Sequence, residues 1–163
     1  TLEYSKESLI PIDKEIESLQ NYLELEQLRF NNNFDFSITK STEIEDDVAL
    51  PPLLLQPFVE NAIIHGVIPK KTKGKIKVDF QIDKESLVCT IEDDGVGCET
   101  SKKVKENSVS VHKSMAIDII KKRLEMIASS THKNATISIE EINANNNNSG
   151  TKVVLKLPIQ YIQ

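Results

Sequence analysis

Two short segments of this 163-residue chain carry side chains suited to binding a phosphorylated ligand. The first contains Glu60 and Asn61, with His65 four residues after Asn61. On a helix, residues four apart share a face. A carboxamide oxygen is a hard ligand suited to Mg²⁺, and an imidazole can donate a hydrogen bond to a phosphate oxygen. On these residues alone, a solvent-exposed polar helix face is the commoner explanation.

The second segment is Asp93-Asp94-Gly95-Val96-Gly97, directly after the apolar run 87–91. Two glycines one residue apart permit a tight turn and a close approach of the backbone to a ligand. A carboxylate at a strand end can accept a hydrogen bond from an exocyclic amine. An ordinary hairpin turn also explains Asp-Gly. The segment lacks the Gly-Lys-Ser or Gly-Lys-Thr of a phosphate-binding loop and the third glycine of a dinucleotide fingerprint.

Composition limits the function classes. The chain is 39% hydrophobic and 28% charged, with a net charge of −5. Basic residues interspersed among acids argue against a nucleic-acid-binding surface. The longest apolar run, Leu50–Val59, is interrupted by prolines and is too short to span a membrane. We therefore expect one soluble domain with two reduced thiols, Cys89 and Cys98, and with neither nucleic acid nor direct membrane contact.

Helical periodicity predicts three helices that must position these segments. The first runs from about Asp13 to Arg29, with Asp13 as N-cap and with Glu15 and Glu17 near the positive end of the helix dipole. The second runs from Pro51-Pro52 to His65, and Gly66 is its expected left-handed stop. The third runs from about Ser114 to Ser129.

Alternating patterns predict five strands, and most come in adjacent pairs, not singly between helices. A turn at 83–85 joins the second and third strands as a hairpin, and a long loop is expected over 98–113. This order predicts an α+β, two-layer sandwich with a mixed, mostly antiparallel sheet and its helices on one face. The five strands are expected at 34–39, 75–82, 86–92, 135–142 and 152–157.

The motifs and their order resemble the ATP-binding domain of sensor histidine kinases, in the superfamily that also contains gyrase and MutL. More narrowly, Ile12–Glu26, Leu28–Phe30 and the PPLLLQPFVENAIIHG segment Pro51–Gly66 are similar to the LytS-type kinases. The resemblance covers nearly the whole chain. It implies the Bergerat-type histidine kinase ATPase fold and ATP with Mg²⁺ as cofactors.

The resemblance assigns the helix residues to the phosphates. Asn61 would bind the Mg²⁺ that bridges the ATP phosphates. Glu60 would orient a metal-bound water, and His65 would reach a phosphate.

The resemblance assigns the remaining site residues to the adenine and the lid. Asp93 matches the adenine-reading aspartate, Gly95 and Gly97 would give close backbone approach, and Thr151 would support Asp93 through water. Lys113 lies where the lid enters the third helix, and a solvated loop charge explains it equally well. For Arg123, helix packing is preferred over phosphate contact.

Two departures from the family pattern stand out. Ser114-Met115-Ala116-Ile117 replaces the glycine pairs that usually open the third helix, which weakens the case for phosphate binding there. The family's acceptor histidine lies beside a His-Phe-Leu-Phe-Asn pattern, which is not present around His65, His112 or His132. We interpret residues 1–11 as the remnant of an upstream helical dimerisation and phospho-acceptor region, and 12–163 as the ATP-binding domain.

The implied function is transfer of the ATP γ-phosphoryl group to a histidine outside this chain, in a two-component signalling system. The expected partners are the upstream phospho-acceptor domain and a cognate response regulator. The expected location is the cytoplasmic part of a membrane-bound bacterial sensor kinase. Two alternatives stay open: an anti-sigma-type serine protein kinase, and a nucleotide-dependent interaction module without catalysis.

Overall fold

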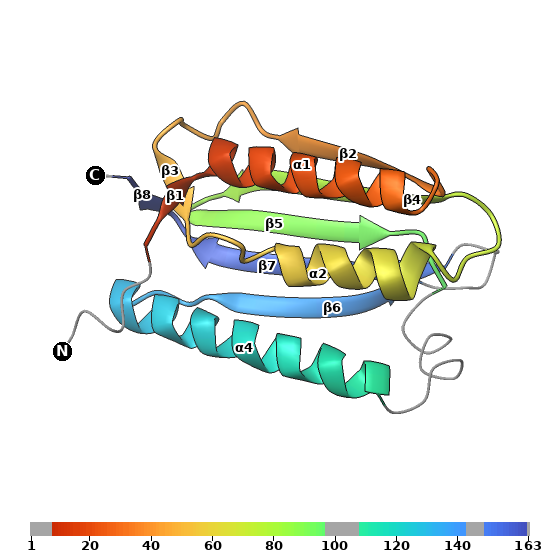
Figure 1. Ribbon diagram of the computed structural model, residues 1–163. Coiled ribbons are helices and arrows are strands. Elements are labelled where there is room, and N and C mark those ends of the chain that lie inside the picture. Colours follow the sequence, from red (N-terminus) through yellow and green to blue (C-terminus); the bar gives the residue numbers. More distant parts are fainter. Residues whose placement is uncertain (1–7, 97–107, 143–148, 163) are drawn as a thin grey trace.

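A computed structural model describes residues 8–96, 108–142 and 149–162. Helices cover one face of a five-stranded sheet, as Figure 1 shows. The strand order is β2-β4-β5-β7-β6. The two-layer α+β architecture predicted from the sequence is therefore confirmed. The bounds of the sheet strands are β2 Phe34–Lys40, β4 Gly74–Asp83, β5 Ser86–Asp93, β6 Thr136–Ile142 and β7 Gly150–Pro158.

The sheet is mixed because one strand pair is parallel. β2 runs parallel to β4, whereas the β4–β5, β5–β7 and β6–β7 pairs are antiparallel. Alternation fixes the face that each side chain occupies. In β4, Ile76, Val78 and Phe80 are buried, while Lys75 and Lys77, which alternate with them, are exposed. The predicted hairpin between β4 and β5 is present.

The first helix matches its prediction closely, and its start differs. α1 spans Ile12–Arg29, and its N-cap is Pro11. Asp13 therefore lies inside the first turn, where its carboxylate pairs with the Lys40 ammonium at 2.6 Å. The N-cap prediction for Asp13 was wrong because the preceding Ile10-Pro11 is tied into a strand, β1 (Ile10–Pro11), which leads directly into the helix.

The second helix begins later and ends later than predicted. α2 spans Gln56–Asn61 and continues as a π-helix, η2, over Ala62–Val67. The backbone N–H of Ile68 donates to the carbonyl of Ile63 at 3.0 Å, which is the five-residue spacing of a π-helix. Gly66 lies inside this segment, so it is not a left-handed stop.

The last helix, α4, spans Ser108–Thr131. The long loop expected over 98–113 was therefore wrong for 108–113, which are helical, while 97–107 lie outside the described residues. Lys113 is inside α4 and not at a loop-to-helix junction. Ile120, Leu124 and Ile127 bury one side of α4. None of the helices in the described part of the chain is long and apolar enough to cross a membrane.

A small second sheet was not predicted. Its order is β1-β3-β8, with β3 at Val48–Leu50 and β8 at Gln160–Tyr161. Strands of two or three residues are too short to show a periodicity, so sequence patterns do not reveal them. This sheet lies at the same end of the molecule as the start of α1 (Figure 1).

Candidate nucleotide-binding site

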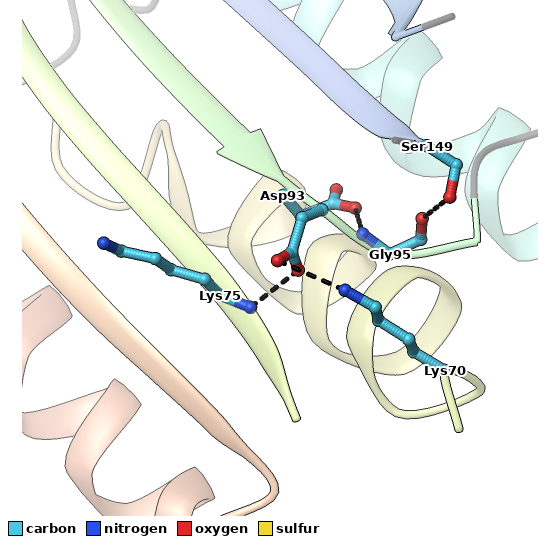
Figure 2. Close-up of polar contacts among 6 residues, drawn as sticks. Lys70, Lys75, Asp93, Gly95 and Ser149 are labelled. Atoms are coloured by element: carbon cyan, nitrogen blue, oxygen red, sulfur yellow. Dashed lines mark hydrogen bonds and ion pairs between the residues drawn. The ribbon is translucent and has the colours of Figure 1, made fainter. Parts of the chain in front are cut away.

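Asp93 ends β5 and is the buried acid at the centre of the candidate site. Asp93 is only 5% exposed. The N–H of Gly95 donates to Oδ1 of Asp93 at 2.9 Å (Figure 2). An aspartate that accepts a hydrogen bond from the backbone two residues later stabilises a tight turn. The Asp-x-Gly sequence therefore fixes the carboxylate relative to its own backbone.

The π-helix packs directly on this turn, with no side chain between them. A β-carbon built on Gly66 would lie 2.6 Å from Oδ1 of Asp93, and one on Gly95 would lie 2.1 Å from the carbonyl carbon of Gly66. The N–H of Val96 donates to the Gly66 carbonyl at 3.1 Å. Gly66 is therefore needed for close approach to Asp93, and not for the left-handed conformation that we expected.

A third segment completes the surroundings of Asp93. Thr151 of β7 lies opposite Asp93 in the antiparallel register. Ser149 donates from Oγ to the Gly95 carbonyl at 2.6 Å, which Figure 2 shows. Gly150 adopts a φ of 153°, and a β-carbon there would lie 2.0 Å from the Asp93 carbonyl oxygen. Three segments distant in sequence thus meet around Asp93 and the turn that follows it.

The neighbouring acid, Asp94, has a different function. Its Oδ1 accepts the backbone N–H of Lys75 at 2.7 Å, and its Oδ2 pairs with the Lys70 ammonium at 3.3 Å. Asp94 therefore fastens the chain after β5 to the start of β4. A cavity of about 350 Å³ lies beside it. The residues that line this cavity are Lys70, Lys75, Lys77, Glu92, Asp93, Asp94, Ile142 and Ser149.

The predicted phosphate-side residues come from α2 and η2. Glu60 is exposed, and its Oε1 accepts a hydrogen bond from Nε2 of Gln56 at 3.3 Å. Asn61, the last residue of α2, and His65 in η2 are both partly buried. The shared face that we expected assumed α-helical spacing. Because the backbone from Ala62 onward is π-helical, that spacing no longer establishes it.

The structure brings part of the predicted site together. Asp93, Gly95 and Thr151 are neighbours, and His65 is adjacent to Gly66, which contacts Asp93. Gly97 lies outside the described residues, and for Lys113 only the helical backbone is described.

Sequence reasoning missed three contributors to the surroundings of Asp93. Gly66 is needed for contact, Ser149 fastens the Gly95 turn, and Asp94 anchors β4. For Ser149, the low-complexity run around it gave no signal. For Gly66, the glycine itself was noticed but was assigned to a helix stop.

Tyr22 of α1 lies near Glu60 of α2. Burial raises the pKa of the Tyr22 hydroxyl, and the nearby carboxylates of Glu26 and Glu60 raise it further. Because like charges disfavour a tyrosinate, Tyr22 remains a neutral hydroxyl beside the exposed Glu60.

The chain resembles bacterial sensor proteins in sequence. It is 37% identical over 101 residues to the sensor protein LytS of Oceanobacillus iheyensis, which covers 60% of this chain and 17% of that protein. It is 33% identical over 112 residues to the uncharacterized protein YwpD of Bacillus subtilis, covering 68% of this chain and 40% of that protein. The chain thus spans less than half the length of these relatives. No known family profile matches it.

Solved histidine kinase structures share the fold. The mycobacterial kinase MprB superposes with a TM-score of 0.61 at 15% identity, covering 96% of this chain and 100% of that one. Full-length ShkA in complex with AMPPNP gives a TM-score of 0.66 at 15% identity, covering 96% of this chain and 32% of that one. ThkA in complex with the response regulator TrrA gives 0.55 at 18% identity, covering 98% and 45%. The chain is therefore similar in sequence to LytS sensor proteins over part of their length, and it has the fold of histidine kinase catalytic domains.

Proposed function

We propose that the chain binds ATP, with the adenine amine donating to Asp93, and that it is the catalytic domain of a sensor histidine kinase. The observation that carries the proposal is the buried carboxylate of Asp93, held where η2, the Gly95 turn and Thr151 meet. A carboxylate has several acceptor positions, so it accepts the Gly95 N–H and an exocyclic amine together. Gly66 allows η2 to approach the Asp93 carboxylate closely.

The phosphates would lie toward Asn61, with Mg²⁺ bound by its amide oxygen. The described residues contain no group of three or more His, Cys, Asp or Glu side chains that could hold a metal ion. A single amide oxygen is nevertheless consistent with Mg²⁺ that arrives with the nucleotide, because this ion takes few protein ligands and several phosphate and water oxygens. When bound, the ion would neutralise phosphate charge.

The residues of this chain would then contribute mainly binding and orientation, which are the larger part of phosphoryl-transfer catalysis. Glu60, exposed and oriented by Gln56, would hold a water on the metal. His65 would donate to a phosphate, and Thr151 would support Asp93 through water. The γ-phosphoryl group would pass to a histidine outside this chain and from there to a response regulator, in the cytoplasm.

Calorimetry with ATP and with ADP tests the binding step. Asp93→Ala should weaken affinity tenfold to a hundredfold, about 1.5–3 kcal/mol, because a hydrogen bond to a charged group is lost in a desolvated pocket. Asp94→Ala is the matched control. It removes the same charge one residue away, from a side chain that binds Lys75 and Lys70 and is not assigned to the adenine. Unchanged affinity in Asp93→Ala would remove the adenine assignment.

The acceptor is tested by adding the upstream helical region of the longer protein to the chain and supplying γ-labelled ATP. Acid-labile, base-stable label on that region supports histidine phosphorylation. Acid-stable label on serine would favour the serine kinase alternative, and binding without transfer would favour the interaction module. Efficient labelling of one of the chain's own histidines would contradict the proposal.

A further inference from the structure

The backbone enters α2 through a turn with an unusual conformation at Leu53. This residue has a φ of 59°, in the left-handed region that leucine seldom adopts. Its side chain is 52% exposed, whereas Leu54 and Leu55 after it are fully buried. Burial of the Leu53 side chain therefore does not explain the conformation, so its cause must lie in the backbone contacts of the turn.

Two charged side chains hold the peptide group that joins Pro52 to Leu53. Oε1 of Glu15, from α1, accepts the Leu53 N–H at 3.1 Å. Nη2 of Arg123, from α4, donates to the Pro52 carbonyl at 2.8 Å. The N–H and the C=O of one trans peptide point in opposite directions. Glu15 and Arg123 therefore hold the same peptide plane from its two sides.

Glu15 reaches this turn from α1 and is buried there, at only 1% exposed. Its Oε1 accepts the Leu53 N–H, and its Oε2 has no hydrogen-bond partner among the described residues. Leu55, the N-cap of α2, has no polar side chain that could hold the start of the helix. The carboxylate from α1 therefore ties the segment that leads into α2 to a second element.

Arg123 extends this tie to α4. Its other terminal nitrogen lies 3.5 Å from the Leu53 carbonyl, so the guanidinium spans two successive carbonyls of the turn. The helix that it holds is short: α2 has six residues and ends at Asn61. In so short a helix, a change in the tilt of the first turn also changes the position of Asn61. The helix-packing interpretation of Arg123 agrees with these contacts.

We propose that Glu15 and Arg123 are positioning residues that set the orientation of α2 and thereby hold Asn61 at the Mg²⁺–phosphate end of the nucleotide site. This inference rests on the proposed function. Because Arg123 belongs to α4, it also gives that helix a direct connection to the helix that carries Asn61. Small displacements of a positioning element have large effects on binding and catalysis.

The test measures the affinity of the full chain for AMPPNP by calorimetry, once with Mg²⁺ and once with excess chelator. Arg123→Gln should weaken binding on the order of tenfold with Mg²⁺ and by less than about twofold without it, since only the Asn61 contact depends on the ion. Glu15→Gln should act in the same direction. Arg123→Lys, which keeps one donor for the Pro52 carbonyl, should recover part of the loss.

A matched control and a double-mutant cycle separate positioning from general destabilisation. Lys122→Gln removes the same charge from the exposed neighbouring position of α4 and should leave affinity unchanged. In an Asn61→Ala background, Arg123→Gln should have no further effect on Mg²⁺-dependent affinity. If Glu15→Gln does not fold, the Arg123 variants decide the question.

Equal losses with and without Mg²⁺, or an undiminished effect in the Asn61→Ala background, would overturn the proposal while leaving nucleotide binding intact. Absence of AMPPNP binding by the unsubstituted chain would overturn the proposed function, and this inference with it.

Discussion

The carboxylate of Asp93 occupies the space in which a β-carbon on Gly66 would lie. The separation between that β-carbon and Oδ1 would be 2.6 Å, which is too close for a carbon and an oxygen that are not bonded. The end of η2 and the end of β5 are therefore in contact through a glycine and an acid. Each constrains what the other can be.

Gly66→Ala should lower the free energy of unfolding by about 1–3 kcal/mol, because the added methyl must displace Asp93 or the helix. It should also weaken ATP binding, since the carboxylate is moved. Urea unfolding and calorimetry measure the two effects. In an Asp93→Ala background, which removes the clashing atoms, the stability cost should become small. A cost of the same size in both backgrounds would show that the clash lies elsewhere.

Asn61→Ala should weaken nucleotide binding chiefly when Mg²⁺ is present, because the amide oxygen would contact the ion and not the base. Titrations with ADP in Mg²⁺ and in excess chelator measure this difference. Lys122→Gln, at an exposed position of α4, serves as the control. An equal loss in chelator would remove the metal assignment.

Leu53→Gly should stabilise the fold relative to Leu53→Ala by about 0.5–1 kcal/mol. Glycine adopts a φ of 59° without the penalty that a β-carbon brings, and part of that gain is offset by the greater freedom of glycine in the unfolded chain. Both variants lose the exposed side chain and keep the N–H that Glu15 binds, so the comparison isolates the backbone. Thermal or urea unfolding gives the result. Lower stability of the glycine variant would mean that the turn does not have this conformation.

Glu15 should make stability depend on pH. Burial raises its pKa above the ordinary value of 4.5, although the N–H groups of Leu53, Leu55 and Leu54 and the charge of Arg123 oppose the rise. The folded state then holds the proton more tightly than the unfolded state. This contribution is fully present below pH 4.5 and is lost as the pH rises through the folded-state pKa.

Urea unfolding of wild type and of Glu15→Gln, from about pH 4 to about pH 8, measures this dependence. The free energy of unfolding of wild type relative to that of Glu15→Gln should fall as the pH rises and then level off. A constant difference across the range would contradict a raised pKa for Glu15.

The sequence predicts the large elements because they bury one face. The alternation of Leu87, Cys89 and Ile91 in β5 is typical of a half-buried strand, and it correctly places Asp93 at the strand end. The resemblance of Pro51–Gly66 to the LytS-type kinases agrees with the LytS sensor proteins among the relatives of this chain. Both signals are local in the chain, which is why a single sequence contains them.

What the sequence could not predict depends on contacts between distant segments. Glu15 looks like a first-turn acid that favours the helix dipole, yet it is buried and binds the Leu53 N–H in the turn that leads into α2. Gly66 looks like a helix stop, yet a glycine is needed there because Asp93 of β5 leaves no space for a side chain. The π-helical turn has no composition signal at all. The binding roles of Glu60, Asn61 and His65 stay predictions.

The short strand β3 joins the beginning and the end of the fold. Ala49 pairs with Pro11 on one side and with Gln160 on the other. Two strand spacings, about 10 Å, therefore separate points at opposite ends of the folded sequence. The chain is therefore suited to circular permutation. A short linker would join the segments around Pro11 and Gln160, and new termini would be placed in the hairpin at Lys84. The sheet that positions Asp93 would keep its strand pairing, although its strands would follow one another in a different sequence order.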